Sequence, residues 1–240
     1  GQRPNTFAEK NIQRTDKNRR IDMAEAKRDV AAEGLRRAYS AGDVLSLKRD
    51  ICEFDGQWLE AVGKPELKGT WCIGGLPKNG KTSFTMQLAK YLTKWHLVAY
   101  DSIEEGVSAS FAEALRRCRM DEVKASRFIV LNNEDIKDIE RRLSKRKSPK
   151  IVIIDSIQFL GLNTETYLRW KKRFSEKLFI YVTHLAGNYP EGRTALKIWR
   201  DSDVVIKVEG FRAYPTSRYG GGKTITVSEE KAAMFEITNH

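Results

Sequence analysis

The sequence is poor in the residues that build disulfide frameworks and metal centres. It has three cysteines and three histidines among 240 residues. Cys52, Cys72 and Cys118 are too far apart for the spacing of a zinc site or of a disulfide-rich domain. We expect reduced thiols, with Cys72 buried in a strand, and a reducing, cytoplasmic location. No apolar run is long enough to span a bilayer and no signal-peptide pattern opens the chain, so no membrane partner is expected.

Acidic residues are outnumbered. There are 43 lysines and arginines against 32 aspartates and glutamates, which makes the formal net charge +11 and the isoelectric point about 9.5. Such a balance favours a polyanionic partner without identifying it. The most basic run, Arg141–Lys150, is typical of a solvated helix end and turn.

One glycine-rich stretch carries clear chemistry. Residues 75–82 read GLPKNGKT, a complete G-x-x-x-x-G-K-S/T phosphate loop. In such a loop the backbone N–H groups line a concavity around phosphates, the lysine reaches the β- and γ-phosphates, and the hydroxyl ligates Mg²⁺. A chance match is the alternative, but an apolar segment precedes the loop and a helical pattern follows it. We therefore expect ATP and Mg²⁺ as cofactors, with Thr82 as a metal ligand and with nucleotide contacts from Gly75, Leu76, Pro77, Lys78, Asn79, Gly80, Lys81, Thr82 and Ser83.

Apolar and amphipathic segments alternate after residue 69, which predicts an α/β fold with a mainly parallel, twisted sheet and helices on both faces. Beyond residue 208, turn signals within YGGGKTITV and the segment MFEIT predict short strands that form an antiparallel edge or hairpin. The expected strands are Thr70–Ile73, Leu97–Tyr100, Arg127–Leu131, Ile151–Asp155, Leu178–Thr183 and Val204–Val208, and the expected helices are Ser83–Thr93, Ser108–Cys118, Asp135–Lys145 and Thr166–Lys177.

The amino-terminal quarter differs in composition. Residues 1–20 are polar and basic, Asp22–Tyr39 is rich in helix formers with only a weak apolar stripe, and Asp50–Val62 is more apolar. The helix at Asp22–Tyr39 is either solvated or a linker that docks on a neighbouring subunit, whereas Asp50–Val62 is expected to pack on the core. Since Gly63–Pro65 marks a boundary, we expect a basic arm and linker over residues 1–65 and the main domain over residues 66–240.

Two acidic segments fit the phosphate loop. The apolar strand Ile151–Ile154 runs into Asp155, which a parallel sheet places beside the loop, where it can hold Mg²⁺. Glu104, after the strand Leu97–Tyr100, is a candidate to orient and deprotonate an attacking water. Glu105 competes with it, because one of the two glutamates can instead cap the following helix.

The ordered set of these segments resembles the RecA-like P-loop ATPase family, and most of all its RadA and DnaB-type helicase branches. The resemblance rests on GLPKNGKTS, SIEEG, IVIIDSIQ, YVTH, DVVIKVEG and SRYG, and covers residues 65–238. It implies catalytic roles for Lys81, Glu104 and Asp155. It also implies that Thr183 and His184 sense the γ-phosphate, although His184 can equally be a structural hydrogen-bonding residue. The segment IDSIQ, which ends at Gln158, is similar to the metal-binding strand of RadA.

The resemblance further implies that Arg212 or Arg218 reaches a neighbouring subunit's nucleotide. The sequence departs from the family in places: it lacks RadA's four-cysteine zinc motif and Lon-like domain, Thr216 replaces the lysine of KNRFG, and the segment before residue 65 is much shorter than a DnaB-type helical domain. The pattern is that of a minimal core of phage or mobile-element type, or of a fragment of a longer protein.

Two segments occupy the positions where RecA-like proteins grip single-stranded DNA, namely residues 161–166 and 186–200. The second is rich in glycine and proline, which predicts a mobile loop, and mixes aromatic with basic side chains that can stack on bases and neutralise phosphates. The alternative is an ordinary connection whose Trp199 packs on the core. The candidate DNA-binding residues are Tyr189, Arg193, Lys197 and Trp199.

Together these features predict a Mg²⁺-dependent, DNA-dependent ATPase that acts on single-stranded DNA as a ring, most simply a hexamer, or as a filament. A replicative-helicase-like motor is the leading hypothesis. The alternatives are a RadA-like recombination or annealing ATPase, and a nucleotide-switched loader with a protein partner.

Overall fold

The computed structural model describes residues 37–238. The chain divides into two compact units between Lys48 and Arg49. In the first unit the described residues form helix α2 (Ala41–Ser46), whose start is capped by reciprocal hydrogen bonds between Ser40 and Asp43. The expected helix Asp22–Tyr39 lies outside the described residues except for residues 37–39, which are not helical.

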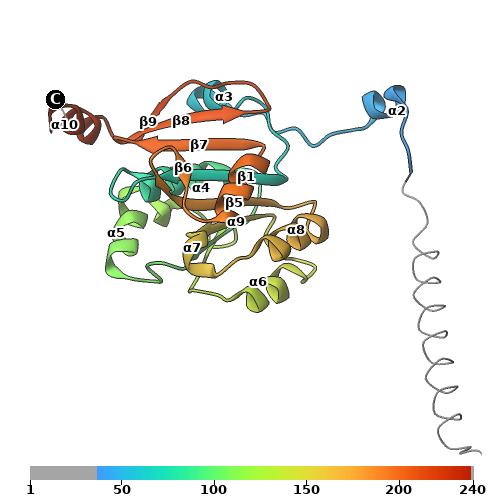
Figure 1. Cartoon of the computed structure of the whole chain (residues 1–240), viewed down its shortest axis with the longest axis horizontal. Coiled ribbons are helices and arrows are strands. Elements are labelled where there is room, and N and C mark those ends of the chain that lie inside the picture. Colours follow the sequence, from blue (N-terminus) through green and yellow to red (C-terminus); the bar gives the residue numbers. More distant parts are fainter. Residues whose placement is uncertain (1–36, 239–240) are drawn as a thin grey trace, which may run out of the picture. The chain divides into compact units, whose positions relative to one another are not determined.

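The second unit is built on one nine-stranded sheet in the order β3-β2-β4-β5-β1-β7-β8-β9, with β6 paired to β5 (Figure 1). The strands from β3 to β7 in this order are parallel, whereas β8 and β9 add an antiparallel edge. The predicted fold class is confirmed. The strands are β1 (Gly69–Gly75), β2 (Val98–Ser102), β3 (Phe128–Leu131), β4 (Ile151–Asp155), β5 (Leu178–Ala186), β6 (Tyr189–Pro190), β7 (Val204–Glu209), β8 (Arg212–Ser217) and β9 (Ile225–Thr226).

Helices cover both faces of this sheet. One face packs on α3, α4 and α5, and the other on α6, α7, α8 and α9. The helices of the second unit are α3 (Gly56–Val62), α4 (Lys81–Leu92), α5 (Ala109–Arg117), α6 (Ile136–Leu143), α7 (Ile157–Leu160), α8 (Thr164–Arg173), α9 (Arg193–Asp201) and α10 (Glu229–Thr238), with a 3₁₀ turn η1 (Met120–Glu122) after α5.

The central strands are apolar on both sides because both sides are covered. All four residues of Ile151–Ile154 are buried, and alternate ones face the two hydrophobic clusters. Aromatic side chains from α3 and the segment before it complete one cluster: Trp58 stacks on Tyr91 at a centroid separation of 5.1 Å, and Phe54 meets Tyr91 edge-on at 5.0 Å. The expected packing of Asp50–Val62 on the core is thereby confirmed, so the unit begins earlier than the expected boundary at residue 66.

Two expectations about local structure are wrong. The segment MFEIT is not a strand, because residues 234–238 continue α10, in which the buried Ala232 faces the core. The segment 186–200 is not an unstructured loop either, because it folds into β6 and α9 and buries Ala195 and Ile198. In MFEIT, apolar packing in the tertiary structure outweighs the alternation of apolar residues that predicted a strand. In residues 186–200, it outweighs the glycine and proline content that predicted a mobile loop.

The described residues contain no helix that is long and apolar enough to cross a membrane. Cys72 is fully buried and its thiol pKa is raised by desolvation, as expected for an inert, structural cysteine.

Candidate active site at the carboxyl edge of the sheet

The phosphate loop joins β1 to α4 and is held by close backbone contacts. Gly80 precedes α4 in the left-handed conformation, with φ +97°, and no side chain caps the helix, so the first N–H groups of α4 have no side-chain partner. A Cβ on Gly75 would come within 2.3 Å of the carbonyl oxygen of Val208. A side chain therefore cannot be placed at Gly75 without moving the loop away from β7.

Asn79 fixes the loop to the turn between β7 and β8. Its amide donates to the Pro77 carbonyl at 3.0 Å, its side-chain oxygen accepts from the Gly210 N–H at 2.9 Å, and its own carbonyl accepts from the Phe211 N–H at 3.1 Å. The Phe211 ring lies against Gly80, where an added Cβ would meet it at 2.8 Å. The sequence pattern treats Asn79 as a variable loop position, so this clamp is visible only in the tertiary structure.

Lys81 lies at the centre of the site and is buried, with 8% of its surface exposed. Its Nζ donates to the Leu76 carbonyl at 3.0 Å inside the loop. Burial lowers the pKa of this ammonium, and the nearby carboxylates of Asp155 and Glu104 oppose that shift. The cation thus lies within the field of two carboxylates.

Asp155 ends β4 next to Ser102, its register partner at the end of β2. Desolvation raises the pKa of Asp155 to about 6, with Glu104 adding to the shift and with the Tyr100 hydroxyl and Lys81 opposing it. Tyr100 donates a hydrogen bond to Oδ2 of Asp155. This bond orients the carboxylate, and sequence analysis missed it because the two residues are far apart in the chain.

The two neighbouring glutamates differ in what they contact. Glu105 accepts from the Ser110 hydroxyl at 2.6 Å, at the start of α5. Glu104 instead lies 3.1 Å from Nε2 of His184, near the end of β5 at the same edge of the sheet. Both glutamates line the cavity beside the phosphate loop. Because Glu105 is bound by the start of α5, the geometry favours Glu104 as the carboxylate that is free to act on a substrate and Glu105 as the residue that stabilises the helix start.

A second network links His184 to the segment after β4. Gln158 donates from Nε2 to the Thr183 hydroxyl at 2.6 Å and accepts at Oε1 from the His184 N–H at 3.4 Å. Nδ1 of His184 is buried without a hydrogen-bond partner. The exposed ring of Phe159 meets the imidazole edge-on, with centroids 6.5 Å apart. The two expected sensor residues therefore lie between the catalytic candidates and α7.

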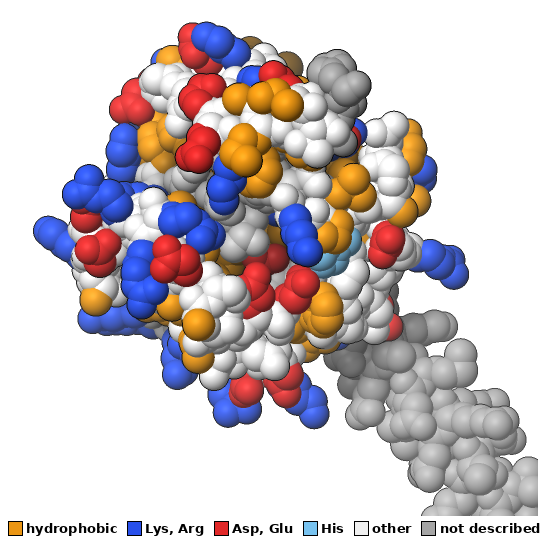
Figure 2. All heavy atoms as spheres, turned by 90° about the vertical axis from the view of Figure 1, so that its left-hand side faces the viewer, with side chains coloured by type: hydrophobic (Ala, Val, Ile, Leu, Met, Phe, Trp, Pro, Cys, Tyr) orange, Lys and Arg blue, Asp and Glu red, His pale blue; other side chains and the backbone are white. Residues whose placement is uncertain are grey.

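Two cavities flank the loop. One, of about 250 Å³, contains Lys81, Thr82, Glu104, Asp155 and His184 among its lining residues. The other, of about 270 Å³, is bordered by the loop, Phe211 and Lys231, whose Nζ lies 5.4 Å from the centre of the Phe211 ring. Figure 2 looks onto this carboxyl edge, where acidic side chains gather in a hollow beside a histidine and are surrounded by lysines and arginines.

The comparisons with known proteins concern the fold. No protein-family model matches the sequence, and no curated protein matches it. Among solved structures, a KaiC-like protein from the archaeon Pyrococcus horikoshii superposes with a TM-score of 0.53 at 16% identity, over 74% of this chain and 93% of that one. The flagellar accessory protein FlaH from Methanocaldococcus jannaschii superposes with a TM-score of 0.52 at 14% identity, over 75% and 96% of the two chains. A further solved ATPase domain matches at 17% identity and a TM-score of 0.47, over 69% and 83%.

The chain has the RecA-like P-loop fold. At these identities the likeness shows the fold, and the chemistry must be argued from the residues of the site.

Within the RecA-like fold the two candidate arginines lie far apart. Arg212 begins β8 beside the phosphate loop and pairs with Glu236 of α10 at 2.8 Å. Arg218 follows the other end of β8 and pairs with Asp203 at 3.2 Å, at the edge where β1 starts. The six residue steps from Arg212 to Arg218 correspond to about 20 Å of extended chain. Arg218 is therefore remote from the phosphate loop of its own RecA-like domain.

The candidate DNA-binding residues also separate into two groups. Tyr189, Arg193 and Lys197 are exposed on β6 and α9. Trp199 packs against the second hydrophobic cluster, and its ring lies where a Cβ on Gly74 would meet it at 2.7 Å. The structure thus favours the core-packing alternative for Trp199.

The residues present fit a nucleotide with a magnesium ion. A hydroxyl and a carboxylate, Thr82 and Asp155, line the same cavity as Lys81, and oxygen donors are the ligands that Mg²⁺ prefers. No cluster of three or more protein ligands occurs among residues 37–238.

Proposed function

We propose that this protein is a Mg²⁺-dependent ATP hydrolase that assembles into a ring or filament and acts on single-stranded DNA. The observation that carries the hydrolase proposal is the convergence of Lys81, Thr82, Glu104 and Asp155 on one cavity beside the phosphate loop. These residues come from three different strand ends, and each has the chemistry that phosphoryl transfer requires.

Each residue of the site has its own role in the proposed hydrolysis. Lys81 neutralises the β- and γ-phosphates, and the Tyr100 hydroxyl orients Asp155. Glu104 accepts the proton of the attacking water, so that the water oxygen bonds to the γ-phosphorus and ADP leaves. His184 holds the Glu104 carboxylate at the cavity. A Mg²⁺ ion held by Thr82 and Asp155 would supply positive charge for the phosphate oxygens.

Each site is completed by a second subunit. Within one chain, Arg212 is engaged by Glu236 and Arg218 lies at the opposite edge of the sheet. The side chain of Arg218 is 67% exposed. A head-to-tail arrangement would bring Arg218 to the nucleotide of a neighbour, where a guanidinium stabilises charge on the transferred phosphoryl group.

Single-stranded DNA is the proposed substrate of the assembly. The support is the net charge of +11 together with exposed aromatic and basic side chains at the carboxyl edge. Phe159 on α7 and Tyr189 on β6 are 57% and 59% exposed, and Arg193 and Lys197 lie on the adjacent α9. Exposed rings stack on bases, and the cations neutralise phosphates in a salt-dependent way.

Steady-state ATP hydrolysis with and without single-stranded DNA, at two salt concentrations, tests this function. Salt-sensitive stimulation by DNA is the expected result. A six-fold ring and duplex unwinding would then indicate a helicase-like motor, whereas filaments on DNA would indicate a recombinase or annealing ATPase. If DNA does not change the rate of ATP hydrolysis but ATP still promotes assembly, the protein is instead a nucleotide-switched loader with a protein partner.

A further inference from the structure

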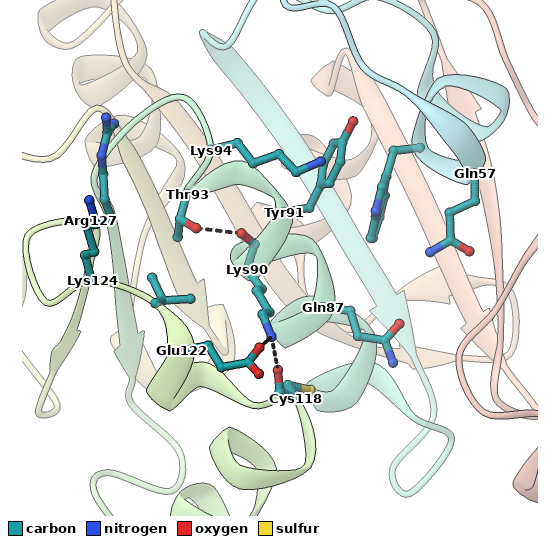
Figure 3. Close-up of a pocket in the computed structure, with 12 residues that line it drawn as sticks. Gln57, Gln87, Lys90, Tyr91, Thr93, Lys94, Cys118, Glu122, Lys124 and Arg127 are labelled. Atoms are coloured by element: carbon teal, nitrogen blue, oxygen red, sulfur yellow. Dashed lines mark hydrogen bonds and ion pairs between the residues drawn. The ribbon is translucent and has the colours of Figure 1, made fainter.

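A groove on the far side of α4 from the sheet is not used by the proposed chemistry. It has a volume of about 630 Å³ and lies between α3 and the turn η1. In Figure 3, Lys124 and Arg127 lie on one side of the groove and Gln57 lies on the other, with α4 between them. The floor includes the stacked rings of Trp58 and Tyr91. The groove therefore combines an aromatic base with a cationic rim.

The cations on this rim are only partly neutralised. Lys90 bonds to Glu122 at 2.8 Å, as Figure 3 shows. Lys124 and Arg127, in contrast, have no carboxylate partner among the described residues, and the guanidinium of Arg127 contacts the Trp95 carbonyl. The chemistry of the groove thus favours an occupant that has apolar side chains next to acidic ones.

Helix α10 has this chemistry. Ala232 is buried and the Phe235 ring packs against Gly210, so one face of α10 is anchored to its own β7–β8 turn. Met234 and Ile237 are 60% and 80% exposed. They lie four and seven residues after Glu230, a spacing that places all three on one helical face.

The first turn of α10 has two carboxylates, Glu229 and Glu230, that form no ion pair within residues 37–238. The acidic residues of α10 are complementary to the cations Lys124 and Arg127 on the rim of the groove. Its exposed apolar side chains, Met234 and Ile237, are complementary to the aromatic floor. Because Phe235 and the Glu236–Arg212 pair hold α10 against its own hairpin, Met234 and Ile237 are directed away from that copy.

We propose that α10 of one copy docks in the groove of a second copy, with Met234 and Ile237 on the aromatic floor and Glu230 beside Lys124. Two different surfaces of the same chain meet in this contact, so it is head-to-tail and builds a ring or a filament. The inference extends the proposed assembly and rests on it.

The same contact fits the position of Arg218. Helix α3 borders the groove through Gln57 and Trp58, and it also packs on the end of β8, where the Ser217 hydroxyl donates to the Val62 carbonyl at 2.6 Å. In the other copy, α10 adjoins the phosphate loop through Lys231 and Phe211. A neighbour that inserts α10 into the groove therefore brings its nucleotide site toward the edge that carries Arg218.

The first test measures self-association of the full chain with Mg²⁺ and ATP by sedimentation velocity. Ile237→Asp should weaken association by about ten-fold or more, as loss of a buried apolar anchor does. Leu168→Asp is the matched control, because Leu168 is an exposed leucine on α8, across the sheet. Its association should stay within about two-fold of the unaltered chain. Equal association of the two variants would overturn the proposal.

A charge exchange makes the test specific. Lys124→Glu should weaken association, and adding Glu230→Lys to the same chain should restore it, because opposite charges again face each other. Failure of the double variant to recover would rule out this pairing. In a further test, an Ile237→Cys chain treated with a short bismaleimide should form a ladder through Cys118, which borders the groove. The same chain with Cys118→Ser should not.

Nucleotide binding and hydrolysis, measured on the same samples, separate this proposal from the proposed function. If Ile237→Asp associates normally and hydrolyses ATP, the docking contact is wrong and the ATPase stands. If association depends on Ile237 but the unaltered chain hydrolyses no ATP, the docking contact stands and the ATPase is wrong. A chain that stays monomeric with Mg²⁺ and ATP overturns the docking contact and the shared site together.

Discussion

The two edges of the sheet differ in what they hold. At the carboxyl edge, Lys81, Glu104 and Asp155 meet in one cavity, together with the hydroxyl of Thr82. At the amino edge lie Arg218 and, along α3 and α4, the cationic groove. One edge has nearly every group that phosphoryl transfer needs, and the other has an exposed arginine without a substrate. This difference supports the proposal that each edge functions against the opposite edge of another copy.

The largest expected effect comes from the carboxyl edge itself. Lys81→Ala removes the buried ammonium that faces Glu104 and Asp155, so we expect ATP turnover to fall to background and nucleotide affinity to fall with it. A phosphate-release assay and fluorescent-nucleotide binding measure the two quantities. Normal turnover in this variant would mean that the reaction takes place elsewhere.

The arginines at the two ends of β8, Arg212 and Arg218, distinguish the edges. Arg218→Ala should lower turnover by about 1,000-fold while sparing nucleotide binding, as loss of an arginine supplied in trans does. Arg212→Ala is the matched control: it removes only a partly exposed pair with Glu236, so turnover should change by less than about three-fold. The opposite ranking would assign the catalytic arginine to the carboxyl edge and contradict the shared site.

Mixing the inactive variants sharpens the same comparison. When Lys81→Ala and Arg218→Ala chains are combined in equal amounts, about one quarter of head-to-tail interfaces join an intact loop to an intact arginine. Hydrolysis should therefore reappear at about that fraction of the unaltered rate. A mixture as inactive as its components, in a sample shown to exchange subunits, would exclude sites built from two chains.

A smaller effect is expected within the acidic pair of the carboxyl edge. Glu104→Gln removes the carboxylate beside His184 and should lower turnover by about 100-fold, the usual range for a general base. Glu105→Gln should change turnover little, because Glu105 accepts hydrogen bonds from the hydroxyls at the start of α5. Turnover under saturating ATP compares the two variants, and a greater loss from Glu105→Gln would reverse the assignment.

The last expected effect concerns stability and leaves turnover unchanged. Asp101 is fully buried at the end of β2, where desolvation raises its pKa to about 6. A carboxyl with a raised pKa in the folded state loses stability as pH rises through that pKa. Asp101→Asn should therefore raise the free energy of unfolding by up to about 3 kcal/mol at pH 8. The gain should vanish below about pH 4, where the carboxyl is protonated in both states.

Urea unfolding across this pH range measures the effect, with turnover as the control. Asp101 lies on the sheet face that packs on α6 and accepts the Glu134 N–H at 3.3 Å, and asparagine retains that acceptor. ATP hydrolysis should therefore be unchanged at pH 8. A stability gain that is independent of pH would show that ionisation of Asp101 is not its cause.

Much of the fold follows from local sequence. Strands such as Ile151–Asp155 are apolar along nearly their whole length because both faces are covered, and this pattern is legible without a structure. The segment MFEIT shows the limit of such patterns. Its apolar residues suit a strand, but the buried Ala232 and the anchored Phe235 place it in a helix.

The candidate site also has residues that the sequence predicts and contacts that only the folded structure shows. Lys81, Thr82 and Asp155 follow from a loop pattern and from an apolar strand that ends in an acid. The hydrogen bond from Tyr100 to Asp155 does not, because it joins neighbours whose adjacency depends on strand order. The sequence leaves two alternatives for Trp199, DNA binding and core packing. Only its position beside Gly74 in the folded chain favours core packing.

The sequence by itself determined the phosphate loop, the parallel order of strand and helix, and the acid that ends β4, because these depend on short-range spacing and on the alternation of buried residues. The tertiary structure decided which of two adjacent glutamates contacts His184 and which contacts the start of α5, and at which edge each arginine lies. Those choices depend on which strands become neighbours and which faces remain uncovered, and only the folded chain specifies both.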